Sequence, residues 1–192
     1  TGSVTQNGAL RTGALDLRSK GAATFTLTCP GNAIQSLSAN LEQCAAGASS
    51  IAVVSTGSLA LGGVVTQVDP VDITLVGGAS TLTAAGTGGT PVIDTNGGDV
   101  TLVVCGSVIG STDAGETISA GNLKVTATGD IGTGNSSACA LLRVDLTGSL
   151  TARGSGVSVG STAPLSVQQV DALLDASILG SSSVTIGSHS TA

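Results

Sequence analysis

The sequence predicts an all-β fold, a parallel β-solenoid of about nine coils in which a single domain spans residues 1–192. Three observations predict it. The apolar residues include almost no aromatic side chains, glycines separate short segments rich in β-branched residues, and apolar positions recur about every 21 residues.

The apolar content lacks the side chains that dominate an ordinary compact core. Hydrophobic residues make up 41% of the chain, yet Phe25 is the single aromatic residue and Trp, Tyr and Met are absent. Aromatic side chains normally supply much of the area that a compact core buries. Stacked thin layers of Val, Leu, Ile, Ala and Thr bury apolar area without them, because each coil of a solenoid packs on its neighbours.

Glycine, serine and threonine punctuate the chain at short intervals. The 29 glycines fit frequent tight turns, and the β-branched residues between them alternate with polar residues, which predicts strands. In the N-terminal half the predicted strands are 14–19, 24–29, 51–55, 58–63, 71–76 and 80–84.

In the C-terminal half the repeat is regular. A step of 21 residues connects one set of apolar positions, and a parallel set lies two residues further on. A spacing of two places both sets on one face of each strand, so we expect them to point inward and Lys124 between them to point outward. The predicted core ladder is Leu102, Leu123, Val144, Leu165 and Ile186, with Val104, Val125, Leu146 and Val167.

Two segments also have helical spacing of apolar residues. They are 33–43, with the sequence AIQSLSANLEQ, and 166–179, with the sequence SVQQVDALLDASIL. We assign both to the solenoid, because Leu165 and Val167 keep the repeat. A short helix over 168–176 is the alternative.

The charge distribution excludes two classes of partner. Charged residues make up 9% of the chain, with a net charge of −6 and only six Lys and Arg. A nucleic-acid partner would need a basic patch, and a membrane span would need about 20 consecutive apolar residues; the sequence contains neither. Since it has no initiator Met and no signal sequence, we expect a processed chain or a piece of a longer one.

Four cysteines occur without a CxxC pair, so a zinc site is not expected. Four cysteines allow three connectivities, and we predict the pairing of neighbours in sequence, with the other two left open. Disulfides would place the protein in an oxidising compartment. The predicted disulfides are Cys29 with Cys44 and Cys105 with Cys139.

One segment has oxygen ligands at a spacing typical of calcium loops. Asp94, Asn96 and Asp99 are a weak calcium candidate. The segment lacks the acidic residue that closes an EF-hand loop, and Asn-Gly-Gly is an ordinary turn signal. We therefore predict no metal site and no cofactor.

A polysaccharide-active enzyme is a less favoured alternative, because such enzymes also use β-helices. Asp130 and Asp145 are its candidate acids, near Arg143 or Arg153 on adjacent coils. Neighbouring charges on a surface are more often weak ion pairs, and glycan grooves usually offer several aromatic rings. We predict no catalytic residues and no enzyme.

Ice binding is another less favoured alternative. It would need a Thr-x-Thr ladder repeated at every coil. Thr24, Thr26 and Thr28 form one such run, and Thr81 and Thr83 form a second, but neither recurs at the period of the repeat.

Two segments carry a family resemblance. Residues 2–39, GSVTQNGALRTGALDLRSKGAATFTLTCPGNAIQSLSA, and residues 118–134, ISAGNLKVTATGDIGTG, resemble the repeats of filamentous-haemagglutinin-like proteins and autotransporter-type passengers. The resemblance implies a right-handed parallel β-helix exported by a bacterium. The chain departs from this family in its short length and in having four cysteines.

The expected function follows from the ends of such a rod. A solenoid exposes unpaired strand edges at both ends unless they are capped, and no capping segment is evident. We expect a structural subunit of an extracellular or cell-surface filament, built by end-to-end stacking of copies of the chain. An adhesin passenger segment of a longer exported rod is the alternative, with host or surface glycans as its partners.

Overall fold

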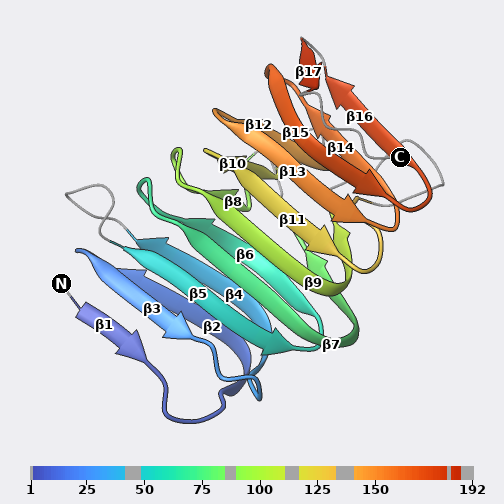
Figure 1. Cartoon of the computed structure of the whole chain (residues 1–192). Helices are drawn as coiled ribbons and strands as arrows, with labels where there is room; N and C mark the ends of the chain where they lie inside the picture. Colours follow the sequence, from blue (N-terminus) through green and yellow to red (C-terminus); the bar gives the residue numbers. More distant parts are fainter. Residues whose placement is uncertain are drawn as a thin grey trace.

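In the computed structural model the chain winds into a rod of parallel strands, with β1 at one end and β17 at the other (Figure 1). The structure describes residues 2–41, 49–84, 90–110, 117–132, 141–180 and 183–186. These residues form an all-β solenoid of about seven turns with a period of about 23 residues and no helix. The predicted fold class is confirmed.

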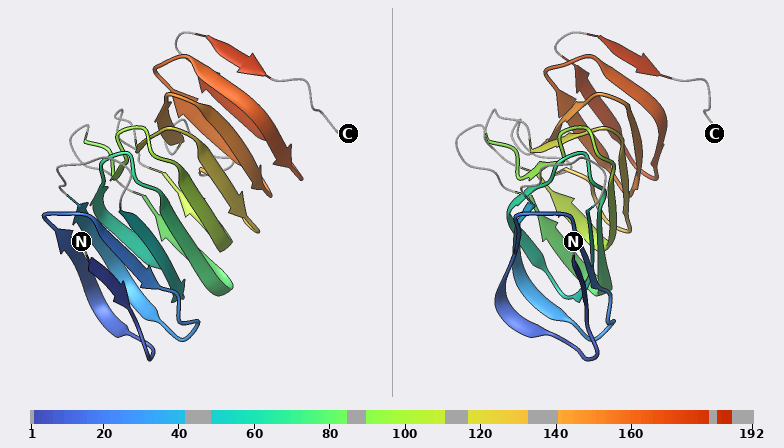
Figure 2. Two further views of the ribbon diagram at one scale, coloured as in Figure 1. Left: turned by 60° about the vertical axis from the view of Figure 1, so that its left-hand side comes forward. Right: turned by 90° about the vertical axis from the view of Figure 1, so that its left-hand side faces the viewer.

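The strands form two walls, because each strand pairs mainly with the strand two places along the chain. The odd-strand wall contains β1 (Gly2–Thr5), β3 (Ala23–Leu27), β5 (Ser50–Thr56), β7 (Val71–Thr83), β9 (Val100–Ile109), β11 (Leu123–Ala127), β13 (Ser149–Gly154), β15 (Leu165–Ala172) and β17 (Val184–Ile186). The even-strand wall contains β2 (Arg11–Ser19), β4 (Ala33–Leu41), β6 (Leu59–Val65), β8 (Ile93–Asp94), β10 (Ile118–Ala120), β12 (Leu142–Leu146), β14 (Val157–Ser161) and β16 (Ala176–Gly180). The two walls face each other across the rod (Figure 2).

Strands β7 and β9 are long because each bends from one wall into the other. Their first halves pair from Val71↔Val100 to Leu75↔Val104, and their second halves pair from Ser80↔Gly106 to Thr83↔Ile109. The second half of β7 also pairs with β6 of the even-strand wall. The predicted strands of the N-terminal half all fall within or overlap observed strands.

The predicted nine coils of 21 residues are wrong in number and length. Along the odd-strand wall the step between paired residues varies from 17, between Leu150 and Val167, to 29, between Val71 and Val100. The corners and loops take up this variation, together with register shifts inside the β4–β6 and β13–β15 pairings. A single fixed step could not describe it.

The predicted core ladder places most side chains correctly in the interior but predicts the wrong partner for them on the next coil. Leu102 pairs with Val125 rather than Leu123, and Val144 lies in the even-strand wall opposite Ile118. At Leu102 the true step is two residues longer than the predicted one, and a shift of two leaves the inward or outward direction of a side chain unchanged. All members of the ladder except Ile186 are buried.

Both segments with helical spacing are strands. Residues 33–41 form β4 and residues 165–172 form β15, so the alternative of a helix over 168–176 is wrong. From Leu37 onward the burial of β4 alternates and hides Leu37, Ala39 and Leu41, so the period of two of a strand replaces the helical spacing there.

Apolar side chains fill the space between the walls in stacked columns. One column contains Phe25, Ile51, Val71, Val100 and Leu123, which follow one another in register along the odd-strand wall, and all are at most 7% exposed. Because the space between the walls is narrow, Val, Leu, Ile and Ala side chains fill most of it, and Phe25 is the one aromatic residue in the core.

Glycine allows the corners of successive coils to approach closely. A Cβ on Gly106 would lie 1.9 Å from the carbonyl oxygen of Ser80, and one on Gly121 would lie 2.2 Å from that of Gly97. Real Cβ atoms do not come so close to backbone, so these positions require glycine. The described residues include no helix suited to crossing a membrane.

Candidate functional site: the two ends of the rod

The terminal strands pair on one side only. At one end β1 pairs with β3 and β2 with β4. At the other end β16 pairs with β14 and β17 with β15. Within the described residues, the outer edges of these four strands therefore carry backbone N–H and C=O groups that no further strand meets.

Apolar side chains are exposed at the C-terminal end. Val184 and Ile186 pair with Leu165 and Val167, which are each 2% exposed, whereas Val184 is 37% and Ile186 70% exposed. The two outer residues continue the inward column, and within the described part of the chain no coil covers them. Leu173, Leu174 and Leu179 are exposed at the same end.

The N-terminal end is open in a similar way but to a smaller extent. Val4 pairs with Phe25 and is 45% exposed, while Phe25 is 7% exposed. Leu15 pairs with the buried Leu37 and is itself only partly covered. Each end thus presents the side chains of an unfinished core layer.

The two ends carry charges of opposite sign. The N-terminal coil has exposed Arg11, Arg18 and Lys20, with Asp16 as its acid. Arg18 Nε and Asp16 Oδ2 form an ion pair of 2.8 Å. Past Gly154 the described residues contain two charged side chains, the acids Asp171 and Asp175, and Asp171 stands opposite Arg153 of β13 in the strand register. Asp171 Oδ2 accepts a hydrogen bond of 2.8 Å from Gln169 Nε2.

A buried asparagine fixes the corner beside the N-terminal end. Asn32 is fully buried, and its amide exchanges hydrogen bonds of 2.7 and 2.9 Å with that of Gln6. Its Nδ2 also lies 3.0 Å from the carbonyl oxygens of Leu27 and Val54, and its Oδ1 accepts a hydrogen bond of 2.8 Å from the N–H of Leu10. One side chain therefore connects three successive coils. The sequence signalled only a turn here.

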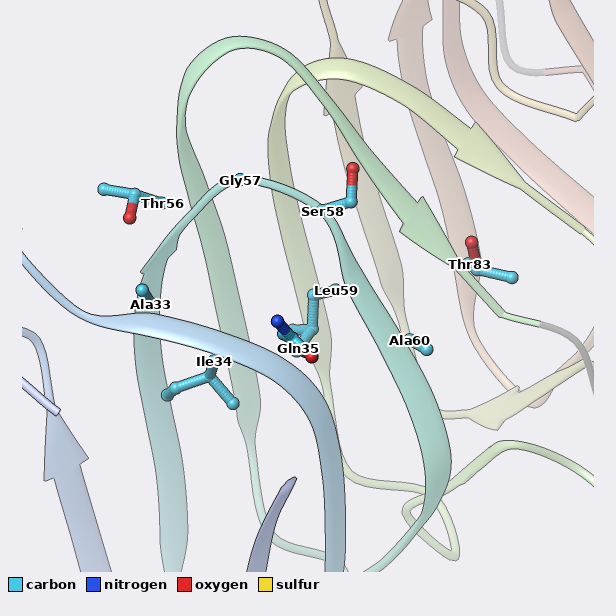
Figure 3. Close-up of a pocket in the computed structure, with 9 residues that line it drawn as sticks. All are labelled: Ala33, Ile34, Gln35, Thr56, Gly57, Ser58, Leu59, Ala60 and Thr83. Carbon is cyan, nitrogen blue, oxygen red and sulfur yellow. The ribbon is translucent and has the colours of Figure 1, made fainter. Parts of the chain in front are cut away.

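A shallow hollow lies at the corner between β5 and β6 (Figure 3). Its walls come from three successive coils and offer small apolar, hydroxyl and amide groups. None of its lining residues has a titratable side chain, so it contains no acid, no base and no activated nucleophile. The lining residues are Ala33, Ile34, Gln35, Thr56, Gly57, Ser58, Leu59, Ala60 and Thr83.

The candidate catalytic acids are not brought together. Asp130 lies in the corner after β11, where its Oδ1 accepts a hydrogen bond of 2.9 Å from the N–H of Gly156. Asp145 lies on β12 of the even-strand wall and pairs with Ser119. Arg153 lies on β13 of the odd-strand wall. Glycosidases need two carboxyl groups that face one bond, and these two acids do not converge.

Two buried polar atoms of the described residues have no hydrogen-bond partner, namely Thr117 Oγ1 and Arg143 Nε. The two residues are neighbours, because the N–H of Thr117 donates to the carbonyl oxygen of Arg143 at 2.8 Å. Arg143 forms no ion pair within the described part of the chain. Nothing in the sequence around Thr117 distinguished it from other strand threonines.

The calcium candidate is a hydrogen-bonded corner. Asp94 Oδ1 accepts from the N–H of Asn96 at 3.0 Å, and Asp99 Oδ1 accepts from Asn122 Nδ2 at 2.9 Å. Asn96 adopts a left-handed φ of 47°. The side-chain oxygens thus stabilise the turn and the coil below it. Within the described residues no cluster of three or more His, Cys, Asp or Glu could hold a metal ion.

The structure gives no support to the predicted disulfides. Cys29 and Cys105 are free thiols, each partly buried. Their predicted partners, Cys44 and Cys139, lie outside the described residues.

The threonine runs do not form a ladder along the rod. Thr26 pairs with Thr5 on one side but with Ala52 on the other. Thr81 and Thr83 of β7 pair with Ser107 and Ile109. Each run therefore ends after one or two coils.

Neither a scan against protein-family models nor searches of curated proteins and of solved structures find a match to this chain.

Proposed function

We propose that this chain is a structural subunit of an extracellular or cell-surface filament that assembles by end-to-end stacking. The observation that carries the proposal is the pair of open ends. Each end has unpaired strand edges and exposed apolar side chains that continue the inward columns of the core. A second copy of the same solenoid offers edges of matching spacing and chemistry.

Burial at such a joint would stabilise it. Full burial of a Val or Ile side chain contributes about 1.5–3 kcal/mol, and the inward-facing Val4 and Ile186 are 45% and 70% exposed. New backbone hydrogen bonds between β17 and a second strand would add to this. Joining two subunits costs translational and rotational freedom. Because this cost is smaller at high protein concentration, long rods are favoured there.

Contact between different ends propagates without limit. Since the N-terminal and C-terminal ends are different surfaces, a joint between them is heterologous and leaves one open end of each kind. The product is a filament rather than a closed ring, because the rod in Figure 1 has its ends on opposite sides.

An adhesin passenger segment of a longer exported rod is the second candidate. The resemblance of residues 2–39 to filamentous-haemagglutinin-like repeats favours it. On this hypothesis the same edges meet further coils of one polypeptide, and surface glycans are the partners. Catalysis and ice binding are disfavoured by the separation of Asp130 from Asp145 and by the interrupted threonine runs.

Negative-stain microscopy of the purified chain over a range of concentrations tests the proposal. We expect rods that lengthen with concentration, and native mass measurements with and without reductant that show a ladder of multiples of 18.2 kDa. Val4→Asp should stop growth, because it places a charge in the joint. Val103→Asp is its control, since Val103 is exposed on the outer face in the middle of the rod.

Short rods that never elongate at any concentration would contradict the filament. Growth of the Val4→Asp protein at the rate of the unaltered protein would show that the N-terminal end takes no part in assembly.

A further inference from the structure

From the strand directions and the end charges, we infer that the joint is polar. The β17 edge of one copy pairs in parallel with the β1 edge of the next copy, and all subunits point the same way along the filament. This inference rests on the proposed function and goes beyond it, since stacking alone would also permit joints between two identical ends.

The strand pairing favours this orientation. Every pairing between named strands is parallel, from β1 with β3 to β15 with β17. A second copy in the same orientation continues the wall with parallel strands. Two identical ends related by a two-fold axis, with inward side chains kept inward, would instead place their edge strands antiparallel. The parallel joint preserves the geometry that the rest of the rod uses.

The inward side chains at the two edges have the same spacing. Val184 and Ile186 are two residues apart and stand over Leu165 and Val167. Gly2 and Val4 are two residues apart and stand over Ala23 and Phe25. Parallel pairing of the two edges places Ile186 against Val4 and Val184 against Gly2. Both columns of the odd-strand wall would then run across the joint without a break.

The charges disfavour any joint between identical ends. At the N-terminal end the Arg18 and Asp16 side chains neutralise each other, which leaves Arg11 and Lys20 without an ion pair in the described part of the chain. At the C-terminal end neither Asp171 nor Asp175 forms an ion pair within the described residues, although Asp171 stands opposite Arg153 of β13 in the strand register. Contact between identical ends brings like charges together, whereas contact between different ends brings two cations near two acids.

The size of this preference depends on salt. These side chains are at the surface, where individual pairs are weak and are screened over about 8 Å at physiological ionic strength. We therefore expect the charges to select the orientation of the joint, while the apolar columns supply most of its stability.

Charge reversal at one end at a time tests the inference. The N-reversed protein carries Arg11→Glu and Lys20→Glu, and the C-reversed protein carries Asp171→Lys and Asp175→Lys. In low salt each protein alone should need a roughly tenfold or higher concentration than the unaltered chain to elongate, because its two ends then have the same sign. An equimolar mixture should elongate like the unaltered chain, since the two proteins can alternate.

Mixing separates an electrostatic joint from a defect in folding. A protein that is merely damaged is not rescued by a second damaged protein. Lys124→Glu, an exposed reversal in the middle of the rod, is the control and should elongate normally. Thermal melts of each protein establish that it is folded, and the Asp175→Asn protein gives a milder variant if a double reversal does not fold. It should elongate less readily than the unaltered chain, and unchanged growth would count against the inference.

The outcomes distinguish the two proposals. If the unaltered chain elongates and the reversed proteins elongate equally well alone, the polar joint is wrong and stacking stands. If mixing gives no recovery although both proteins are folded, the polar joint is also wrong. If the unaltered chain never elongates, both proposals fail.

Discussion

The middle coils and the last coil of this rod contain the same kinds of side chains in the same alternation, yet their burial is opposite. Ile73 and Leu102 are fully buried, whereas Val184 is 37% and Ile186 70% exposed. The burial differs because a middle residue has a coil on each side, whereas a residue of the last strand has a coil on one side. Ile73 has strands on both sides, and among the residues that the structure describes Ile186 has a strand on one side only.

This contrast shows that the core is a stack of contacts between coils rather than an enclosed interior. A residue is buried because a coil lies above it and another below it. The last layer of such a stack is always incomplete. The proposed joint between ends therefore depends on the same features that fold the middle of the rod.

The largest effect is expected from a charge in the middle of the stack. Val125→Asp or Leu146→Asp would place an unpaired carboxylate between two coils, which costs several kcal/mol, on the order of the whole stability of a domain. We expect loss of the folded state by circular dichroism. Lys124→Ser on the outer face of the same strand should change stability by less than about 0.5 kcal/mol. Equal melting temperatures for Val125→Asp and Lys124→Ser would refute the inward and outward assignment.

A smaller but still large effect is expected where two corners touch. In Gly106→Ala the new Cβ would lie 1.9 Å from the carbonyl oxygen of Ser80, so the two coils must separate. We expect a loss of about 3 kcal/mol in the free energy of unfolding, at the upper end for overpacking. Gly78→Ala is the control, because nothing lies within 4 Å of its Cβ position. Comparable denaturation midpoints for the two proteins would show that the corners are not in tight contact.

The sequence predicted the parts of this comparison that depend on local alternation. Strands β3, β5 and β11 and the inward direction of Val125 and Leu146 follow from a period of two. The neighbour of each residue in the stack was predicted wrongly, because corner lengths decide it. A shift of two residues changes the partner of Leu102 from Leu123 to Val125 and leaves the alternation intact.

The sequence predicted that both ends expose unpaired strand edges, but not which side chains and charges lie there. A solenoid exposes one edge of its last strand, so the unpaired edge of β17 could be expected. The prediction that Ile186 is buried assumed that a further coil covers it. The opposite charges of Lys20 and Asp175 are visible in the sequence, but only the fold places Lys20, which follows β2, and Asp175, which precedes β16, at opposite ends of the rod. The role of Asn32 depends on contacts with Gln6 and Val54, which are distant in sequence.

The corner beside the N-terminal end provides the next test of how coils are held together. Asn32→Ala removes the hydrogen bonds to Gln6 and Leu10 and leaves buried backbone groups without partners. We expect a loss of about 2 kcal/mol in the free energy of unfolding, measured by chemical denaturation. Asn7→Ala is the control, because Asn7 is exposed in the same corner. If both substitutions had equal effects, Asn32 would not be what connects the coils.

A matched pair of threonines tests the contribution of a single buried hydroxyl in the middle coils. Thr95 Oγ1 donates a hydrogen bond of 2.6 Å to the carbonyl oxygen of Gly98, whereas Thr117 Oγ1 has no partner. Both residues are fully buried. Thr95→Val should lose about 1 kcal/mol, and Thr117→Val should be neutral or stabilising, because it removes a buried polar atom that makes no hydrogen bond. The reverse order in denaturation experiments would contradict these hydrogen-bond assignments.

The smallest effect on stability is expected at the C-terminal end. There an Asp in place of an apolar residue should be tolerated, although the same substitution in the middle of the rod should unfold the chain. In Ile186→Asp the new carboxylate remains in water, since Ile186 is 70% exposed and has a coil on one side only. At concentrations where the chain is a monomer, its free energy of unfolding should stay within about 0.5 kcal/mol of the original. At concentrations where the unaltered chain elongates, the variant should remain short, because the joint would bury the charge. A large loss of stability in the monomer would mean that β17 is already covered within a single chain, and the contrast between middle and end would then disappear.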